Sequence, residues 1–269
     1  MDYIENYYSN YDEEARLGYK WGQIEFLTTM RYINKYLEQK PNAHVLEIGA
    51  GTGRYSRTIA DMGYRVEAVE LVPHNITIFK EQIKPTQNIN VTQGNALDLN
   101  KIADNTFDIT LVLGPMYHLY NDADKQQAIS EALRVTKVEG IVFVAYCISD
   151  ASILEDAFKR NALWISDYLS TGKIDPVTFA TTSLPEDIFE LVRKDDIDRL
   201  MTNFQVERLH YVATDMISRI LRESIENMNQ EKFELYLRYH YAICERPDMV
   251  GMTHHSLDIF RKMGISKFV

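Results

Sequence analysis

Residues 44–53 read HVLEIGAGTG, a short apolar run that ends in three glycines at positions 49, 51 and 53. The apolar run predicts a buried strand, and the amphipathic pattern of residues 54–62 predicts a helix directly after it. Glycine suits a turn in which the main chain takes a left-handed conformation or approaches a ligand closely. The turn therefore places backbone N–H groups and a helix N-terminus at the carboxyl edge of a sheet, a geometry that binds a nucleoside ligand.

On both sides of this turn, short apolar runs alternate with amphipathic stretches, which is the pattern of a parallel sheet flanked by helices. The predicted strands are residues 44–49, 65–70, 89–94, 107–113, 140–146, 205–212 and 255–261. The predicted helices are residues 22–38, 54–62, 74–83, 124–137, with Asp122 or Asp124 as its cap, and 195–203. The chain is thus expected to have an α/β fold.

Two longer helical patterns interrupt this alternation, a single helix at 151–169 and a helical stretch at 215–243 with a break near 227–229. We therefore predict an N-terminal helical leader or lid at 1–40 and a main domain at 41–269. Helical cap insertions are expected at about 150–194 and 214–250.

The net charge of the chain argues against two classes of binding partner. The 269 residues carry a formal net charge of −10, which opposes phosphate backbones and anionic lipid surfaces, so neither nucleic acid nor membrane is an expected partner. The first residues lack the basic start and apolar stretch of a secretory signal, and no run of about 18 uncharged apolar residues occurs. A cytoplasmic location is expected.

The details of the glycine turn favour one cofactor. A dinucleotide fingerprint would need glycine at position 54, where this chain has Arg54, and its third glycine falls one residue early. Glu47 lies two positions before the first glycine, where its carboxylate would repel the pyrophosphate of NAD. The same carboxylate suits a ligand with an ammonium and a sulfonium, so we expect S-adenosylmethionine (SAM).

The next two predicted strands add polar groups at the same edge. Strand 65–70 ends in Glu70, which is placed to accept hydrogen bonds from both ribose hydroxyls. Strand 89–94 leads into Asn95 and Ala96, where a polar side chain can meet the adenine amino group. Three consecutive strand ends would thus address three parts of one ligand.

The segment VLEIGAGTG at 45–53, Glu70, the segment GNA at 94–96 and the segment FD at 107–108 resemble the ordered motifs of class I SAM-dependent methyltransferases. The resemblance covers roughly residues 40–146. It implies a Rossmann-like sheet of seven mostly parallel strands, with helices on both faces and an antiparallel last strand. Many family members carry Asp where Asn95 stands, but an Asn carbonyl oxygen accepts the same bond.

The resemblance also implies the cofactor contacts. Glu47, Gly49 and Gly51 would surround the methionine part, Glu70 the ribose, and Asn95 with Ala96 the adenine, while Leu113 and Gly114 would pass near the sulfur. The full predicted set is Glu47, Gly49, Ala50, Gly51, Gly53, Glu70, Leu71, Asn95, Ala96, Leu113 and Gly114, joined by Tyr11 and Arg16 from the leader, which could meet the SAM carboxylate.

Candidate catalytic residues follow the fourth predicted strand, in the loop GPMYHLY at 114–120, because that loop leaves the sheet beside the sulfur. His118 is the candidate general base and Tyr117 a candidate for orienting the substrate, although either side chain could instead have only a capping or packing role. The run GPMY at 114–117 lacks the Asp or Asn that accepts the hydrogens of a planar amino group, which disfavours base methylation.

No metal site is predicted. The chain lacks an obvious set of two Asp and one Asn after the fourth and fifth strands, and Asp150 alone is a weak candidate. His254 and His255 are adjacent on a strand and should point to opposite faces, one buried and one exposed. We therefore expect a SAM-dependent methyltransferase for a small molecule, and two alternatives stay open: a methyltransferase for protein or RNA, and a SAM-binding protein without catalysis.

Overall fold

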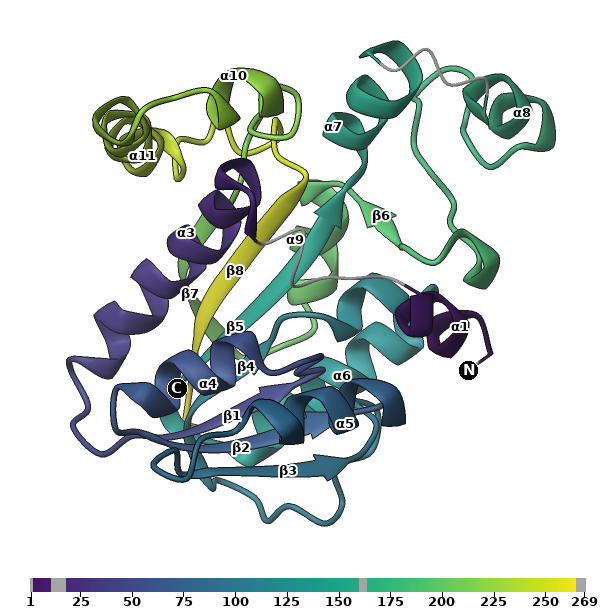
Figure 1. Cartoon of the computed structure of the whole chain (residues 1–269). Coiled ribbons are helices and arrows are strands. Elements are labelled where there is room, and N and C mark those ends of the chain that lie inside the picture. The colour runs from purple at the N-terminus through teal and green to yellow at the C-terminus, as the bar shows by residue number, and fades with distance from the viewer. Residues whose placement is uncertain (1, 11–17, 160–163, 265–269) are drawn as a thin grey trace.

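The computed structural model describes residues 2–10, 18–159 and 164–264. Within them one sheet of eight strands has the order β3-β2-β1-β4-β5-β8-β7, with β6 paired to β5 (Figure 1). The strands are β1 (His44–Ile48), β2 (Arg65–Glu70), β3 (Ile89–Gln93), β4 (Phe107–Val112), β5 (Thr136–Ile148), β6 (Leu191–Val192), β7 (Val206–Ala213) and β8 (His255–Lys262). β8 is antiparallel to β5 and β7, which confirms the predicted mostly parallel sheet with an antiparallel last strand. The additional strand, β6, has two residues, too few for a periodic pattern.

Five helices match the predicted helices of the alternating pattern: α3 (Lys20–Leu37), α4 (Arg54–Asp61), α5 (Pro73–Gln82), α6 (Asp122–Val135) and α9 (Lys194–Met201). The other helices of the described residues are α1 (Asp2–Asn10), α7 (Ser149–Ile153), α8 (Trp164–Thr171), α10 (Arg222–Glu226) and α11 (Gln230–Ile243). Short 3₁₀ turns lie at η1 (Pro115–His118) and η3 (Pro185–Asp187), and a π-helical turn lies at η2 (Leu154–Lys159).

Three local predictions were wrong. The single helix expected at 151–169 is divided into α7, the π turn η2 and α8, and residues 215–221 are not a regular helix. Helix α6 is capped neither by Asp122 nor by Asp124: the Asn121 side chain accepts a hydrogen bond from the Asp124 backbone N–H at 2.9 Å. Both acidic residues instead lie in the first turn, where they complement the helix dipole.

Alternate residues of the central strands bury opposite faces of the sheet, as the two-residue period of a strand requires. On one face Val45 and Ile109 pack with Ile33 of α3 in one apolar cluster. On the other face Leu46 packs with Ile129 of α6 in a second cluster. A sheet that is buried on both faces leaves the ends of its strands as the place for a site.

The order of the strands indicates where along the edge of the sheet the site lies. β1 pairs with β2 on one side and with β4 on the other, so the chain reverses its winding direction between β1 and β4. Ligands of open α/β sheets bind beyond the carboxyl ends of the strands at such a switch point. In Figure 1, α7 and α10 project past the carboxyl end of β5. In the described part of the chain, no helix is both long and apolar enough to cross a bilayer.

Candidate functional site

The glycine turn between β1 and α4 takes the predicted left-handed conformation at all three glycines. The φ angles of Gly49, Gly51 and Gly53 are +73°, +55° and +82°. A Cβ at Gly49 would lie 2.6 Å from the Pro115 Cδ, and a Cβ at Gly53 would lie 2.1 Å from the Phe79 ring, whereas no atom of the described residues lies within 4 Å of a Cβ at Gly51. Gly49 and Gly53 are thus required for close packing, and Gly51 leaves the space above the turn open.

This open space belongs to a cavity of about 940 Å³. Ten predicted cofactor residues line it: Glu47, Gly49, Ala50, Gly51, Glu70, Leu71, Asn95, Ala96, Leu113 and Gly114. Gly53 is not in its wall, because it is turned toward Phe79. The predicted contacts Tyr11 and Arg16 lie outside the described residues. Tyr117 and His118 line the same cavity, so one space joins the glycine turn to the candidate catalytic residues.

Glu47 lies at the cavity wall with its side chain almost fully buried, at 2% exposure. Its carboxylate accepts hydrogen bonds from the Ser56 backbone N–H at 2.9 Å and from the Ser56 hydroxyl, in the first turn of α4. Burial raises the pKa of Glu47 to about 7 and outweighs the two Ser56 hydrogen bonds, which lower it. The charge of this group therefore changes near neutral pH.

Glu70 stabilises the glycine turn and the start of the loop after β2 through its carboxylate. One carboxylate oxygen accepts from the Gly51 N–H at 2.8 Å, and the other accepts from the Val72 N–H at 2.9 Å and from the Asn75 side chain at 3.3 Å. Asn95, in contrast, is exposed, and its side-chain oxygen accepts from the Leu97 N–H at 3.0 Å. The β2 acid is thus fixed in place, while the Asn95 oxygen already has one backbone partner.

His118 is held on both sides of its ring. Its Nδ1 lies 2.8 Å from the carbonyl oxygen of Ile188, which can only accept, so Nδ1 carries the hydrogen. Its Nε2 therefore accepts from the Tyr8 hydroxyl of α1, at 3.0 Å. Burial lowers the pKa of His118 and keeps the ring neutral. The sequence did not reveal the Tyr8 partner, because 110 positions separate the two residues and only a Tyr-rich leader hinted at it.

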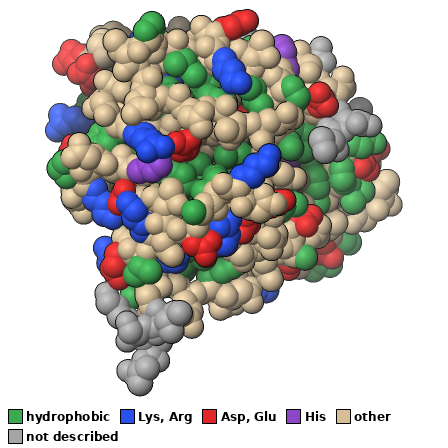
Figure 2. Space-filling model, turned by 90° about the horizontal axis from the view of Figure 1, so that it is seen from below, with side chains coloured by type: hydrophobic (Ala, Val, Ile, Leu, Met, Phe, Trp, Pro, Cys, Tyr) green, Lys and Arg blue, Asp and Glu red, His purple; other side chains and the backbone are tan. Residues whose placement is uncertain are grey.

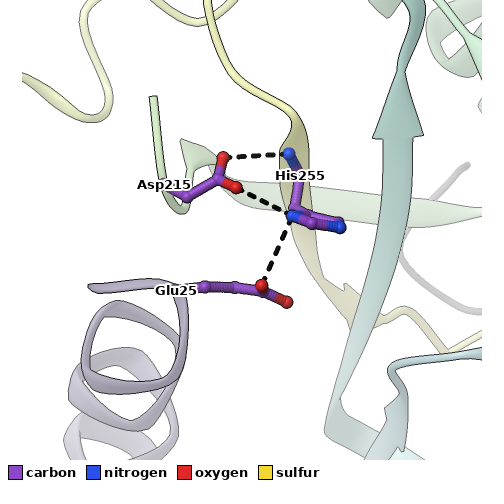
Figure 3. A group of neighbouring side chains, drawn as sticks. All are labelled: Glu25, Asp215 and His255. Atoms are coloured by element: carbon purple, nitrogen blue, oxygen red, sulfur yellow. Dashed lines mark hydrogen bonds and ion pairs between the residues drawn. The ribbon is translucent and has the colours of Figure 1, made fainter. Parts of the chain in front are cut away.

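Glu25, Asp215 and His255 form a second group of polar side chains (Figure 3). Glu25 and His255 line the cavity, and the His255 ring lies 6.0 Å from the Tyr117 ring. The Nδ1 of His255 lies 2.8 Å from the Asp215 Oδ2 and 3.3 Å from the Glu25 Oε2. Burial disfavours charge on His255, but the two carboxylates outweigh it and raise its pKa well above the usual range. No sequence pattern predicted this group, because its members come from α3, the segment after β7 and the first residue of β8.

The prediction for the histidine pair is half wrong. His254 is buried as expected, with 1% of its side chain exposed and its Nε2 3.0 Å from the Glu155 Oε2. His255 is not an exposed residue: only 12% of its side chain is accessible, and it faces the cavity. The surface expected from the strand pattern is covered because α3 packs against this part of the molecule and brings Glu25 to the ring.

A switch-point cavity with a left-handed glycine turn and a fixed β2 acid is the arrangement typical of nucleoside-binding α/β domains. Residues 46–144 match the family model described as "Methyltransferase domain". Over these residues the chain is therefore similar to a methyltransferase domain.

Two curated relatives are similar over part of their length. Phosphoethanolamine N-methyltransferase 1 of Caenorhabditis elegans is 25% identical over 166 residues, 62% of this chain and 33% of the relative. Demethylmenaquinone methyltransferase of Renibacterium salmoninarum is 35% identical over 106 residues, 39% of this chain and 41% of the relative. The chain therefore spans less than half the length of either relative.

The fold is shared with solved structures over most of the chain. A SAM-dependent methyltransferase from Methanosarcina mazei aligns with a TM-score of 0.58 at 16% identity, covering 86% of this chain and 97% of its own. At that identity the likeness extends to the fold, which includes the segments outside the family match.

Proposed function

We propose that this chain transfers a methyl group from SAM to a small-molecule acceptor. The observation that carries the proposal is the single cavity that runs from the glycine turn and Glu70 to Tyr117 and His118. Its volume, about 940 Å³, lies in the upper part of the range for small-molecule sites. Both relatives named above carry small molecules in their names, which agrees with this acceptor class.

The cofactor would lie with its methionine part above the glycine turn, beside Glu47, where an ionised carboxylate favours the ammonium and sulfonium charges. Its ribose would meet Glu70, whose oxygens have further lone pairs to accept from the two hydroxyls. Asn95 and Ala96 would border the adenine, and Leu113 and Gly114 the sulfur. The absence of any atom within 4 Å of a Cβ at Gly51 supports this placement.

The transfer itself is an in-line displacement, for which the protein mainly aligns the reactants. The acceptor atom forms a bond to the methyl carbon, the carbon–sulfur bond breaks, and the sulfur keeps the electron pair. For an acceptor that must lose a proton, we place Tyr8 and His118 in the path: the acceptor proton moves to the Tyr8 oxygen as the Tyr8 proton moves to His118 Nε2. A neutral His118 is required, in agreement with the direction of its pKa shift.

The leader at 1–40 and the insertions at about 150–194 and 214–250 would form the lid of this site. Tyr7 of α1 and Phe189 near β6 support this role, since their rings are 5.4 Å apart, edge to face, and both line the cavity. A closed lid excludes water and bulky polymers. On the face seen in Figure 2, basic and acidic side chains are interspersed, which gives a phosphate backbone no continuous basic stripe there.

Calorimetry with S-adenosylhomocysteine tests the cofactor, and no binding at millimolar ligand would refute the proposal. A screen of metabolite extracts with labelled SAM then tests transfer. Label in a small molecule supports the proposal, whereas label in protein or RNA favours a polymer acceptor. Binding without any labelled product would favour a SAM-binding protein that does not catalyse transfer.

A further inference from the structure

We propose that Glu25, Asp215 and His255 bind a divalent first-row metal ion, such as Mn²⁺, Fe²⁺ or Zn²⁺, on the acceptor side of the cavity. Two carboxylate oxygens and one imidazole nitrogen are a donor set that such ions take in proteins. The metal site stands on its own geometry. Only its use, to hold an oxygen or nitrogen of the acceptor, rests on the proposed function.

The distances between the donor atoms fit a common ion. His255 Nδ1 lies 2.8 Å from Asp215 Oδ2 and 3.3 Å from Glu25 Oε2, and all three atoms lie within 4.8 Å of one another. Ligands bound at about 2.0–2.2 Å to one ion lie roughly 3–3.5 Å apart in tetrahedral or octahedral geometry. Figure 3 shows both carboxylates pointing at the same ring nitrogen.

The surroundings of Asp215 orient it as a ligand. Its Oδ1 accepts three hydrogen bonds, from the Thr253 hydroxyl at 2.7 Å and from the backbone N–H groups of His254 and His255 at 3.0 Å each. These bonds fix the carboxylate plane and leave Oδ2 directed at the His255 ring. Such support of a ligand by neighbouring hydrogen bonds is a regular feature of metal sites.

The number of acceptors at His255 Nδ1 also suits an ion. An imidazole nitrogen carries at most one hydrogen, yet two carboxylate oxygens face the His255 Nδ1, whereas one ion can bind all three atoms. The exposed fractions of the side chains are only 3% for Asp215, 12% for His255 and 13% for Glu25, so the donor atoms are shielded from bulk water.

The position of the group connects it to the acceptor. Glu25 and His255 line the cavity, and the Tyr117 ring lies 6.0 Å from the His255 ring and 6.3 Å from the His118 ring. Three protein ligands leave further coordination positions open on an ion of this kind. An acceptor oxygen or nitrogen bound there would lie in the same cavity as Gly114, the residue proposed to border the cofactor sulfur.

The test is Mn²⁺ binding to the full chain after removal of metals with EDTA, followed by the electron paramagnetic resonance signal of free Mn²⁺. We expect one Mn²⁺ per chain with a micromolar dissociation constant, competed by Zn²⁺. His255→Ala should weaken binding at least 100-fold. Glu25→Gln, which keeps the shape of the side chain, should weaken it at least tenfold and covers the case in which His255→Ala does not fold.

His210→Ala is the matched control, because the His210 Nδ1 lies 2.7 Å from the Glu245 carboxylate in a pair outside this cavity. It should leave Mn²⁺ affinity unchanged. Wild-type binding no tighter than that of folded His255→Ala or Glu25→Gln, or loss of binding in His210→Ala alone, would overturn the proposal. Calorimetry with S-adenosylhomocysteine on the same samples separates the two proposals, since failure of the metal site leaves cofactor binding intact.

Discussion

Gly51→Arg is the substitution that most directly tests where the cofactor binds. Among the residues that the structure describes, no atom lies within 4 Å of a Cβ at Gly51, which leaves room there for a new side chain that extends into the cavity. The φ angle of +55° is unfavourable for an L residue and costs about 1–2 kcal/mol. For a chain of this size that lowers the melting temperature by only a few degrees. The variant should therefore fold.

Cofactor binding should nevertheless be lost, because the arginine side chain would take the space of the methionine part and adds a positive charge beside its ammonium group. We expect the dissociation constant for S-adenosylhomocysteine to rise at least 100-fold, about 2.7 kcal/mol, in isothermal titration calorimetry. Gly63→Arg is the matched control: Gly63 has φ +92°, has equal free space and is exposed at the end of α4. A Gly51→Arg protein that binds within threefold of wild type would show that the ligand lies elsewhere.

Three further predictions concern neighbouring residues. Only ionised Glu47, whose pKa is about 7, favours the SAM cation. The affinity for SAM, measured by calorimetry, should therefore rise about eightfold between pH 6 and pH 7.5, and Glu47→Gln should flatten this dependence on pH. The ligand-free protein should show the opposite trend, losing stability as pH rises from about 4.5 to about 7, because Glu47 ionises at its ordinary pKa in the unfolded chain but only near pH 7 in the folded one. Gly53→Ala should cost roughly 2–5 kcal/mol of unfolding free energy in urea, because its Cβ would overlap the Phe79 ring, and a loss below about 1 kcal/mol would contradict this packing. His118→Ala should lower turnover about 100-fold or more at unchanged cofactor affinity. Tyr8→Phe should lower it to a similar extent, because the acceptor proton reaches His118 through the Tyr8 oxygen, and an unchanged rate in both would remove them from the proton path.

The sheet was predictable because its signals are local. Each strand is a run of apolar residues, and each flanking helix repeats its apolar positions every three or four residues, so neighbours in the sequence carry the information. The predictions were wrong where neighbours outside the element decide the outcome. The π turn η2 interrupts a segment whose apolar spacing suits a helix, and Glu155 in that turn pairs with Arg219 and Arg222 from beyond β7.

The cofactor side of the site was equally accessible from the sequence, because its groups follow consecutive strands and parallel strands bring their carboxyl ends to one edge. Gly51 and Glu70 could thus be placed together without coordinates, and they are joined by a hydrogen bond of 2.8 Å. Gly53 shows the limit of that reasoning, since a motif does not reveal which of its glycines faces the ligand and which faces Phe79.

Residues 44–53 and Glu70 indicate the α/β fold and the proposed cofactor end of the cavity, because the contacts of this region are short in sequence. Tyr8 meets His118 across 110 positions and Glu25 meets His255 across 230 positions, and these two contacts are visible only in the folded chain. No periodic pattern encodes such pairs, because they depend on how the leader and the insertions pack over the sheet. The acceptor side of the site is built from these long-range contacts.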